Sequence, residues 1–233
     1  PFYGQLIRYA DFYPITEGLD RTLEHLREAK RQGYSIAIFP EGTRSPDCSL
    51  LRFRRGAFFL AEQLNMDLLP VVLHGTGHVL PKQDFMLRRG SIHVRVLPRI
   101  TPADTRFGTD HIARARQLRQ FYRAEYEALC RRVETPAYFT DLVLHNYIYK
   151  GPSVERAVRH ALRQHDNYTA EISALPDSGK VTLRNTGYGE QALLAALVKP
   201  HLRITAVEPD DDRRAIAEHC AARPANLQYV SEA

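Results

Sequence analysis

Short apolar runs rich in β-branched residues alternate along this chain with longer segments of helical periodicity. Runs of the first kind indicate buried strands, and the periodic segments indicate helices that cover them. Such alternation is typical of layered α/β domains. We therefore predict an α/β fold. The predicted strands are 35–39, 68–73, 91–97, 180–184, 202–207 and 227–230, and the predicted helices are 19–31, 55–64, 109–134, 139–149, 153–165, 190–198 and 211–222.

The pattern restarts after Pro136, where two helical segments lead into a β-α-β-α-β run. We therefore predict two domains, residues 1–135 and residues 136–233. The second ends before a full sheet could form, so we expect it to be truncated. Residue 1 is Pro rather than Met, and we expect the chain to be a piece of a longer protein.

The basic charge of the chain lies in its first part. Residues 1–135 hold 21 basic and 15 acidic side chains, whereas residues 136–233 hold 11 and 12. An excess of this kind favours an anionic partner, either a phosphate ester or an anionic lipid surface. We expect no nucleic acid, because no basic helix with base-reading residues and no aromatic stacking stripe is present.

Membrane spans and cysteine frameworks are not indicated. The longest apolar run, Ala192–Val198, is far shorter than the roughly 20 residues that a spanning helix needs. Cys48, Cys130 and Cys220 lie far apart, without the paired spacing of a zinc motif or the even number of a disulfide framework. We interpret them as ordinary thiols in a reducing compartment.

One loop carries the residues best suited to bind an anion. It follows the predicted strand 35–39 and reads Pro40-Glu41-Gly42-Thr43-Arg44-Ser45. Gly42 permits a close backbone approach, Arg44 offers a planar fork for phosphate, and Thr43 and Ser45 add hydroxyls. Glu41 could hold Arg44 in place. Further cations follow at Arg52, Arg54 and Arg55, where the next helix begins. The alternative is a solvated turn with a surface Glu–Arg pair.

Three ordered blocks resemble a known family. They are Phe39–Ser45 (FPEGTRS), Arg52–Ala61 (RFRRGAFFLA) and Leu69–Gly75 (LPVVLHG). Together they are similar to the glycerolipid acyltransferases, which acylate lysophosphatidic acid or glycerol 3-phosphate. The resemblance covers about residues 1–100. It implies that the acceptor phosphate is bound by Glu41, Gly42, Thr43, Arg44 and Ser45, together with Arg54 and Arg55.

The resemblance also implies the reaction. An acyl group passes directly from acyl-CoA or acyl-carrier protein to a glycerol hydroxyl, with no metal, no cofactor and no covalent enzyme intermediate. The family's His-x-x-x-x-Asp element is absent, because none of the ten histidines has Asp five positions later. We expect this element upstream of Pro1, and hence negligible acyl transfer by the chain alone. The family's usual Arg after an early strand is also missing, with Thr16 and Glu17 in that neighbourhood.

The roles of two histidines and of a basic helix each have two interpretations. His74 and His78 flank a Gly-Thr-Gly turn, and we favour hydrogen-bonded structural roles over a metal or a general base, because no third ligand is evident. The predicted helix 109–134 either contacts anionic lipid headgroups or presents a solvated face. Its arginines are Arg114, Arg116, Arg119, Arg123, Arg131 and Arg132.

The second part resembles the opening of a class I S-adenosylmethionine-dependent methyltransferase, a Rossmann-like fold. Gly187 and Gly189 match its glycine turn, and Glu208 matches the acid that bonds the cofactor's ribose. The family's first glycine falls at Asn185 and its preceding acid at Leu183. The resemblance implies S-adenosylmethionine as a cofactor of this part.

The order of the two parts is similar to bacterial fusion proteins in which a lipid-exporter-type (MMPL) transporter precedes both. This implies a place on the cytoplasmic face of a bacterial inner membrane. The leading hypothesis is thus an acyltransferase-type α/β domain, incomplete at its N-terminus, followed by the start of a methyltransferase-like domain. One rival is a methyltransferase whose first part is a targeting scaffold. Another is a lipid-binding module without catalytic activity.

Overall fold

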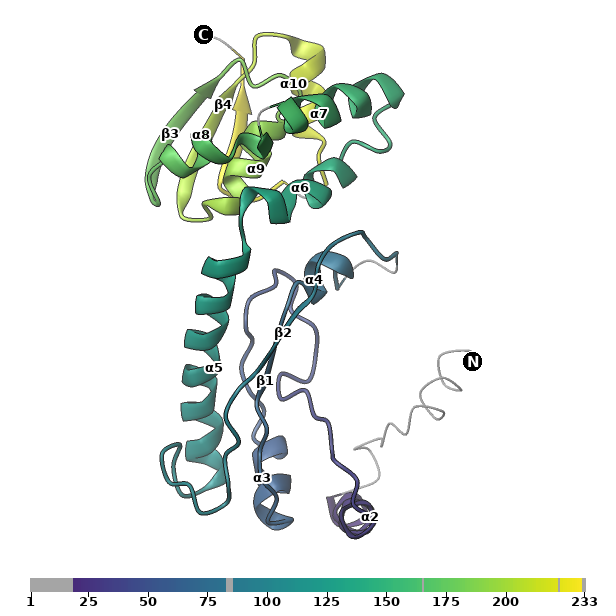
Figure 1. The fold of residues 1–233 in the computed structure, drawn as a ribbon, viewed down its shortest axis with the longest axis vertical. Helices are drawn as coiled ribbons and strands as arrows, with labels where there is room; N and C mark the ends of the chain where they lie inside the picture. The colour runs from purple at the N-terminus through teal and green to yellow at the C-terminus, as the bar shows by residue number, and fades with distance from the viewer. Residues whose placement is uncertain (1–18, 83–85, 165, 222, 232–233) are drawn as a thin grey trace. The chain divides into compact units, whose positions relative to one another are not determined.

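A computed structural model describes residues 19–82, 86–164, 166–221 and 223–231 (Figure 1). The chain divides into two compact units. The first holds the described residues up to Ser45, Leu50–Val72 and Arg95–Ala124. The second holds Pro46–Ser49, Leu73–Val94 and the described residues from Glu125 onward. The predicted domain boundary at residue 135 stays a prediction.

Helices α2 (Leu19–Arg31) and α3 (Gly56–Gln63) pack together in the first unit through leucines. Their common core contains Leu23, Leu26, Leu60 and Leu64. Lys30 Nζ donates to the Leu64 carbonyl over 2.6 Å, which satisfies a carbonyl at the end of α3. The predicted helices 19–31 and 55–64 are therefore confirmed, the second with slightly shorter bounds.

The long helix α5 (His111–Val133) confirms the predicted basic helix. Asp110 Oδ1 accepts the N–H groups of Ile112 and Ala113, each over 2.8 Å. Its carboxylate thus satisfies donors that the first turn of a helix leaves open. These two hydrogen bonds explain why the helix begins here.

Strands β1 (Val71–His74) and β2 (His93–Val96) form a two-stranded sheet. Both are shorter than the predicted strands 68–73 and 91–97. Leu68 instead forms an isolated antiparallel bridge with Ile100. The short helix α4 (Thr76–Val79) follows β1 directly, where the sequence indicated only a tight turn.

The predicted strand 35–39 is wrong. These residues form no strand and join no sheet within the part of the chain that the structure describes, and Ile38 and Phe39 are exposed. A strand needs a hydrogen-bonded neighbour as well as an apolar sequence, and the apolar pattern does not say which neighbour is available. The loop with Arg44 therefore follows an irregular extended segment and not the end of a buried strand.

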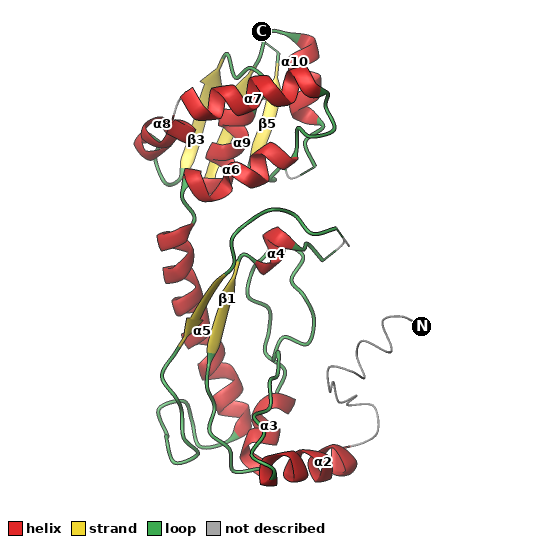
Figure 2. Ribbon diagram, turned by 45° about the vertical axis from the view of Figure 1, so that its right-hand side comes forward, coloured by secondary structure: helices red, strands yellow, loops and turns green. Residues whose placement is uncertain are grey.

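The second unit contains a three-stranded parallel sheet of order β3-β4-β5 (Figure 2). Its strands are β3 (Gly179–Arg184), β4 (Leu202–Val207) and β5 (Leu227–Val230). The register places Val181, Ile204 and Leu227 in one row across the three strands. Every second residue of each strand faces the same side of the sheet. The sequence predicted all three strands to within a residue.

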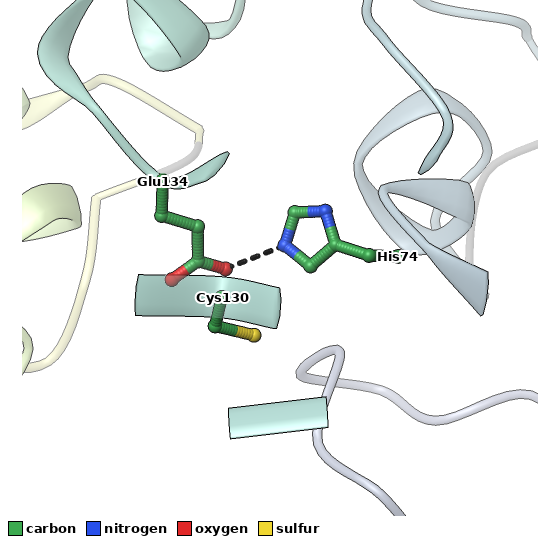
Figure 3. Close-up of side chains that lie close together, drawn as sticks. All are labelled: His74, Cys130 and Glu134. Carbon is green, nitrogen blue, oxygen red and sulfur yellow. Dashed lines mark hydrogen bonds and ion pairs between the residues drawn. The ribbon is translucent and has the colours of Figure 1, made fainter. Parts of the chain in front are cut away.

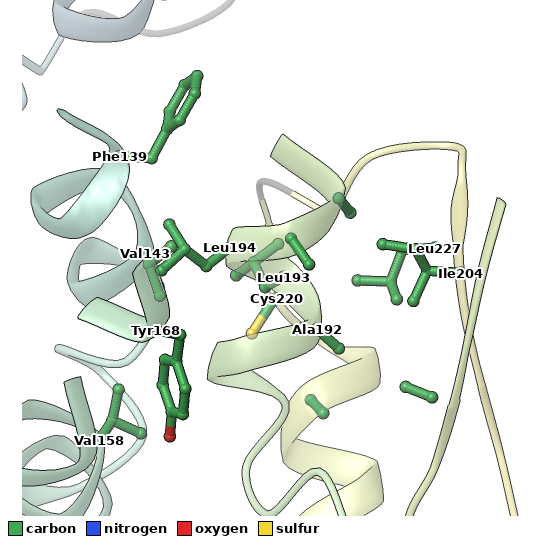
Figure 4. Close-up of a cluster of buried hydrophobic side chains, with 14 of the residues drawn as sticks. Phe139, Val143, Val158, Tyr168, Ala192, Leu193, Leu194, Ile204, Cys220 and Leu227 are labelled. Atoms are coloured by element: carbon green, nitrogen blue, oxygen red, sulfur yellow. The ribbon is translucent and has the colours of Figure 1, made fainter. Parts of the chain in front are cut away.

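Helices cover one face of this sheet, as Figure 2 shows for α6, α7 and α9. Leu193 and Leu194 of α9 are fully buried among neighbouring side chains such as Val143 (Figure 4). The helices are α6 (Pro136–His145), α7 (Pro152–Gln164), α8 (Thr169–Ala174), α9 (Glu190–Val198) and α10 (Asp211–Glu218), with a 3₁₀ turn η2 (Asp166–Tyr168) before α8. The unit is a mixed α/β layer, as predicted.

Candidate functional site

The loop of residues 39–45 is tied to the segment just before α3. Arg54 N–H donates to the Pro40 carbonyl over 2.7 Å, and Glu41 Oε2 accepts the Leu51 N–H over 2.7 Å. Gly42 N–H donates to the Phe39 carbonyl, which closes a turn. Two of these hydrogen bonds fix backbone atoms of the loop, and the third holds the Glu41 side chain, so the loop has a defined conformation without belonging to a strand.

Gly42 and Arg54 are in direct contact. Gly42 has a φ of 70°, and a Cβ there would lie 2.5 Å from Arg54 Nε. Any other residue would meet the cost of a left-handed conformation and would also have to displace the exposed Arg54 side chain. The structure thus brings together two of the residues that the sequence assigned to phosphate binding.

Phe53 determines the direction of its arginine neighbours. Its ring is buried, with its centroid 5.1 Å from that of Tyr122 and 6.0 Å from that of Phe58. Arg52 and Arg54, on either side of it, are exposed. An anchored aromatic side chain between two arginines therefore turns both guanidinium groups toward solvent, where they can meet an anion.

The remaining loop residues are also accessible. Thr43, Arg44 and Arg55 are exposed, and Ser45 is half-buried. Arg55 directly precedes α3, whose free N–H groups add positive potential. A role for Glu41 in orienting Arg44 stays a prediction, because the contact that the structure gives its Oε2 is Leu51 N–H. Thr16 and Glu17 lie outside the described residues.

Gly187, Gly189 and Glu208 also lie together, at the carboxyl edge of the parallel sheet. Gly187 N–H donates to Glu208 Oε2 over 2.6 Å, and Asp210 N–H donates to Oε1 over 3.2 Å. The Glu208 side chain is buried. Gly189, with a φ of 83°, precedes α9 and packs against Tyr229. Parallel strands bring their carboxyl ends to one edge, which is where such folds bind ligands.

Sequence reasoning missed two polar residues beside this turn. Glu190 is buried at the start of α9, and Tyr168 donates to its Oε1 over 3.2 Å. Burial and the neighbouring Glu190 carboxylate raise the pKa of Tyr168 above its usual range. A glutamate directly after Gly189 is a signal that could have been noticed, whereas the contact with Tyr168 has no local pattern.

His74 and His78 each make a side-chain hydrogen bond. His74 is fully buried and its Nε2 lies 2.8 Å from Glu134 Oε1, while His78 Nδ1 lies 2.9 Å from the Tyr138 hydroxyl. Burial lowers the pKa of His78. The sequence raised a metal only for the pair of His74 and His78, whereas the structure groups His74 with Cys130 and Glu134 and not with His78.

Two arginines of the basic helix serve the fold itself. Arg114 is buried and donates to the carbonyls of Pro102, Asp104 and Gly108. Arg119 donates to the Leu51 carbonyl over 3.0 Å. The alternative of a solvated face therefore fails for these two arginines, whereas Arg116, Arg123, Arg131 and Arg132 are exposed. Contact with lipid headgroups stays a prediction for the other arginines.

The first part of the chain is similar to acyltransferase sequences. An acyltransferase family model matches residues 1–74. A 1-acyl-sn-glycerol-3-phosphate acyltransferase of Chlamydomonas reinhardtii is 34% identical over 83 residues, covering 35% of this chain and 25% of the relative. The human 1-acyl-sn-glycerol-3-phosphate acyltransferase alpha is 39% identical over 67 residues, covering 29% and 24%. The enzyme of Saccharomyces cerevisiae is 31% identical over 108 residues, covering 43% and 36%.

The chain spans only about a fifth to two fifths of the length of the curated relatives it matches. No solved structure matches it significantly. The comparisons support neither a methyltransferase segment nor a transporter fusion, and the matched relatives named above are eukaryotic. None of the described helices is both long enough and apolar enough to cross a bilayer.

Proposed function

We propose that this chain supplies the acceptor-binding part of an enzyme that acylates lysophosphatidic acid. The observation that carries the proposal is the acyltransferase match over residues 1–74, which contains the Phe39–Ser45 loop. The loop's hydrogen bonds to the Arg54 segment support it, because they hold a backbone turn and several guanidinium groups within one accessible stretch.

In this proposal each loop residue has a chemical role. Arg44 forms paired N–H···O bonds to the acceptor phosphate, which suits a planar guanidinium. Gly42 lets the ligand approach the backbone, and Thr43 and Ser45 donate hydroxyl hydrogen bonds. Arg54 and Arg55 complement the second negative charge of the phosphate. Binding by several preset donors fixes the acceptor hydroxyl relative to the acyl donor.

The proposed reaction is a direct transfer. The acceptor hydroxyl attacks the carbonyl carbon of an acyl-CoA or acyl-carrier-protein thioester, the C–S bond breaks, and a general base takes the hydroxyl proton. No histidine of this chain has the His-x-x-x-x-Asp spacing. The proposal therefore assigns phosphate binding to residues of this chain, and it assigns the role of general base to none of them. An anionic membrane surface would present the lipid acceptor.

Equilibrium binding of lysophosphatidic acid to the purified chain tests this function. Charged hydrogen bonds contribute roughly 1.5–3 kcal/mol, so Arg44→Gln should weaken binding about 10- to 100-fold. Arg99→Gln is the matched control, since Arg99 is an exposed arginine of the same unit that pairs with Asp67. Equal affinity of both variants and the unaltered chain would show that Arg44 binds no phosphate.

A second candidate function, S-adenosylmethionine binding, concerns the second unit alone. The hydrogen bond between Gly187 N–H and Glu208 supports it, because it joins a glycine turn to an acid at the end of the next strand. The free lone pairs of Glu208 would accept the ribose hydroxyls. Calorimetry should then detect S-adenosylmethionine binding that Glu208→Ala removes and Glu218→Ala on α10 preserves. Absence of binding to the unaltered chain would exclude this candidate.

A further inference from the structure

A compact group of metal-ligating side chains lies where the end of β1 meets the end of α5, entirely within the second unit. Its members are His74, Cys130 and Glu134, each of which offers one ligand atom within 4.8 Å of the other two. Figure 3 shows the imidazole, the thiol and the carboxylate around one small volume. We propose that these three side chains bind a zinc-type transition-metal ion. The proposed acyl transfer does not use this site.

The backbone positions the three ligands. Cys130 lies in the last turn of α5, and Glu134 directly follows the helix. The Glu134 N–H still donates to the Cys130 carbonyl over 2.8 Å, which keeps the two residues one helical turn apart. His74 is the last residue of β1 and has no exposed surface. Donor atoms around tetrahedral zinc lie about 3.3–3.8 Å apart, given bonds of about 2.0–2.3 Å. The observed spacing, within 4.8 Å, requires only small side-chain rotations.

The hydrogen bonds of the His74 ring determine how it could bind a metal ion. Its Nε2 lies 2.8 Å from Glu134 Oε1, while its buried Nδ1 has no hydrogen-bond partner in the part of the chain that the structure describes. The Glu134 carboxylate accepts the Nε2 proton, and the free lone pair lies on Nδ1. Metal binding through Nε2 therefore requires that this proton leave to solvent and that the ion take its place between His74 and Glu134. The thiol proton of Cys130 is released to solvent when the metal–sulfur bond forms.

The donor set identifies the class of metal. A thiolate, an imidazole and a carboxylate together suit Zn²⁺ and exclude Mg²⁺ and Ca²⁺, which prefer oxygen ligands alone. Three protein ligands leave the fourth tetrahedral position to a water molecule. An ion held there would join the end of β1 to the end of α5, and would thereby stabilise the folded unit.

Zinc titration of the chelator-treated chain, in competition with a chromophoric chelator, tests the proposal. We expect one Zn²⁺ per chain, and Co²⁺ in its place should give a thiolate charge-transfer band with tetrahedral visible bands. Cys130→Ser should abolish the charge-transfer band and weaken Zn²⁺ binding by at least about tenfold. Cys220→Ser is the matched control, because Cys220 is a buried cysteine in the core beneath the parallel sheet.

A second variant, Glu134→Gln, serves if Cys130→Ser folds poorly. The Glu134 side chain is about a quarter exposed, so its replacement should disturb folding less. This variant should also weaken Zn²⁺ binding while its circular dichroism spectrum stays unchanged. The proposal is overturned if the folded, unaltered chain binds no Zn²⁺ at micromolar concentration. It is equally overturned if Cys130→Ser and Glu134→Gln bind the ion as tightly as Cys220→Ser does.

Discussion

Replacement of Gly189 by alanine should destabilise the second unit far more than the same change at Gly187. Both glycines have a positive φ, 83° and 59°, so each alanine incurs about 1–2 kcal/mol for a left-handed conformation. Only at Gly189 is the space occupied, because a Cβ there would lie 2.5 Å from the Tyr229 hydroxyl and 2.7 Å from the Ala217 Cβ. At Gly187 the nearest atom is 3.8 Å away.

Overpacking of a core costs typically about 1–3 kcal/mol. Gly189→Ala should therefore lower the free energy of unfolding by about 2–5 kcal/mol, a large part of a domain's usual stability. Gly187→Ala should lower it by about 1–2 kcal/mol. Urea denaturation followed by circular dichroism measures both. Equal losses of unfolding free energy in the two variants would refute the reasoning, because contact with Tyr229 and Ala217 would then cost nothing at Gly189.

Three further outcomes follow from buried polar contacts. Burial raises the pKa of Tyr147 well above 10, so the stability that its neutral form contributes is present below pH 10 and is lost as the pH rises above it. Tyr147→Phe should therefore make the alkaline loss of stability shallower. Denaturation series between about pH 9 and 11, one unit either side of the reference pKa, measure this slope. Arg114→Ala leaves three backbone carbonyls without their donor and should lower the thermal midpoint, whereas Arg116→Ala, at an exposed position, should not. Asn226→Ala removes an amide that donates to the carbonyls of Ala196, Lys199 and Leu202, and a loss of less than about 1 kcal/mol in urea denaturation would contradict that role.

The second half of the chain was the easier part to predict. Apolar runs such as 202–207 alternate with amphipathic segments such as 190–198, and each strand has its parallel neighbour next along the chain. Local pattern and final pairing therefore agree. The run 35–39 has an equally apolar sequence but pairs with no described strand, because a local pattern cannot show whether a neighbouring strand is available.

The candidate sites also differ in how far the sequence could predict them. The loop with Gly42 and Arg44 is a contiguous motif, so the sequence could indicate it, whereas the contact of Arg54 with Gly42 required coordinates. His74 and Glu134 are 60 residues apart, and no sequence spacing joins them. The four-residue interval between Cys130 and Glu134 was visible, but it became informative only once His74 was placed beside it.

Phosphate binding by Arg44 is tested most directly by a thermodynamic cycle. Binding of lysophosphatidic acid and of phosphate-free monoacylglycerol is measured by calorimetry for the unaltered chain and for Arg44→Gln. We expect the substitution to weaken lysophosphatidic acid binding at least about tenfold, from the loss of charged hydrogen bonds, and to leave monoacylglycerol binding unchanged. An equal effect on both lipids, or no effect on either, would contradict the assignment of Arg44 to the acceptor phosphate.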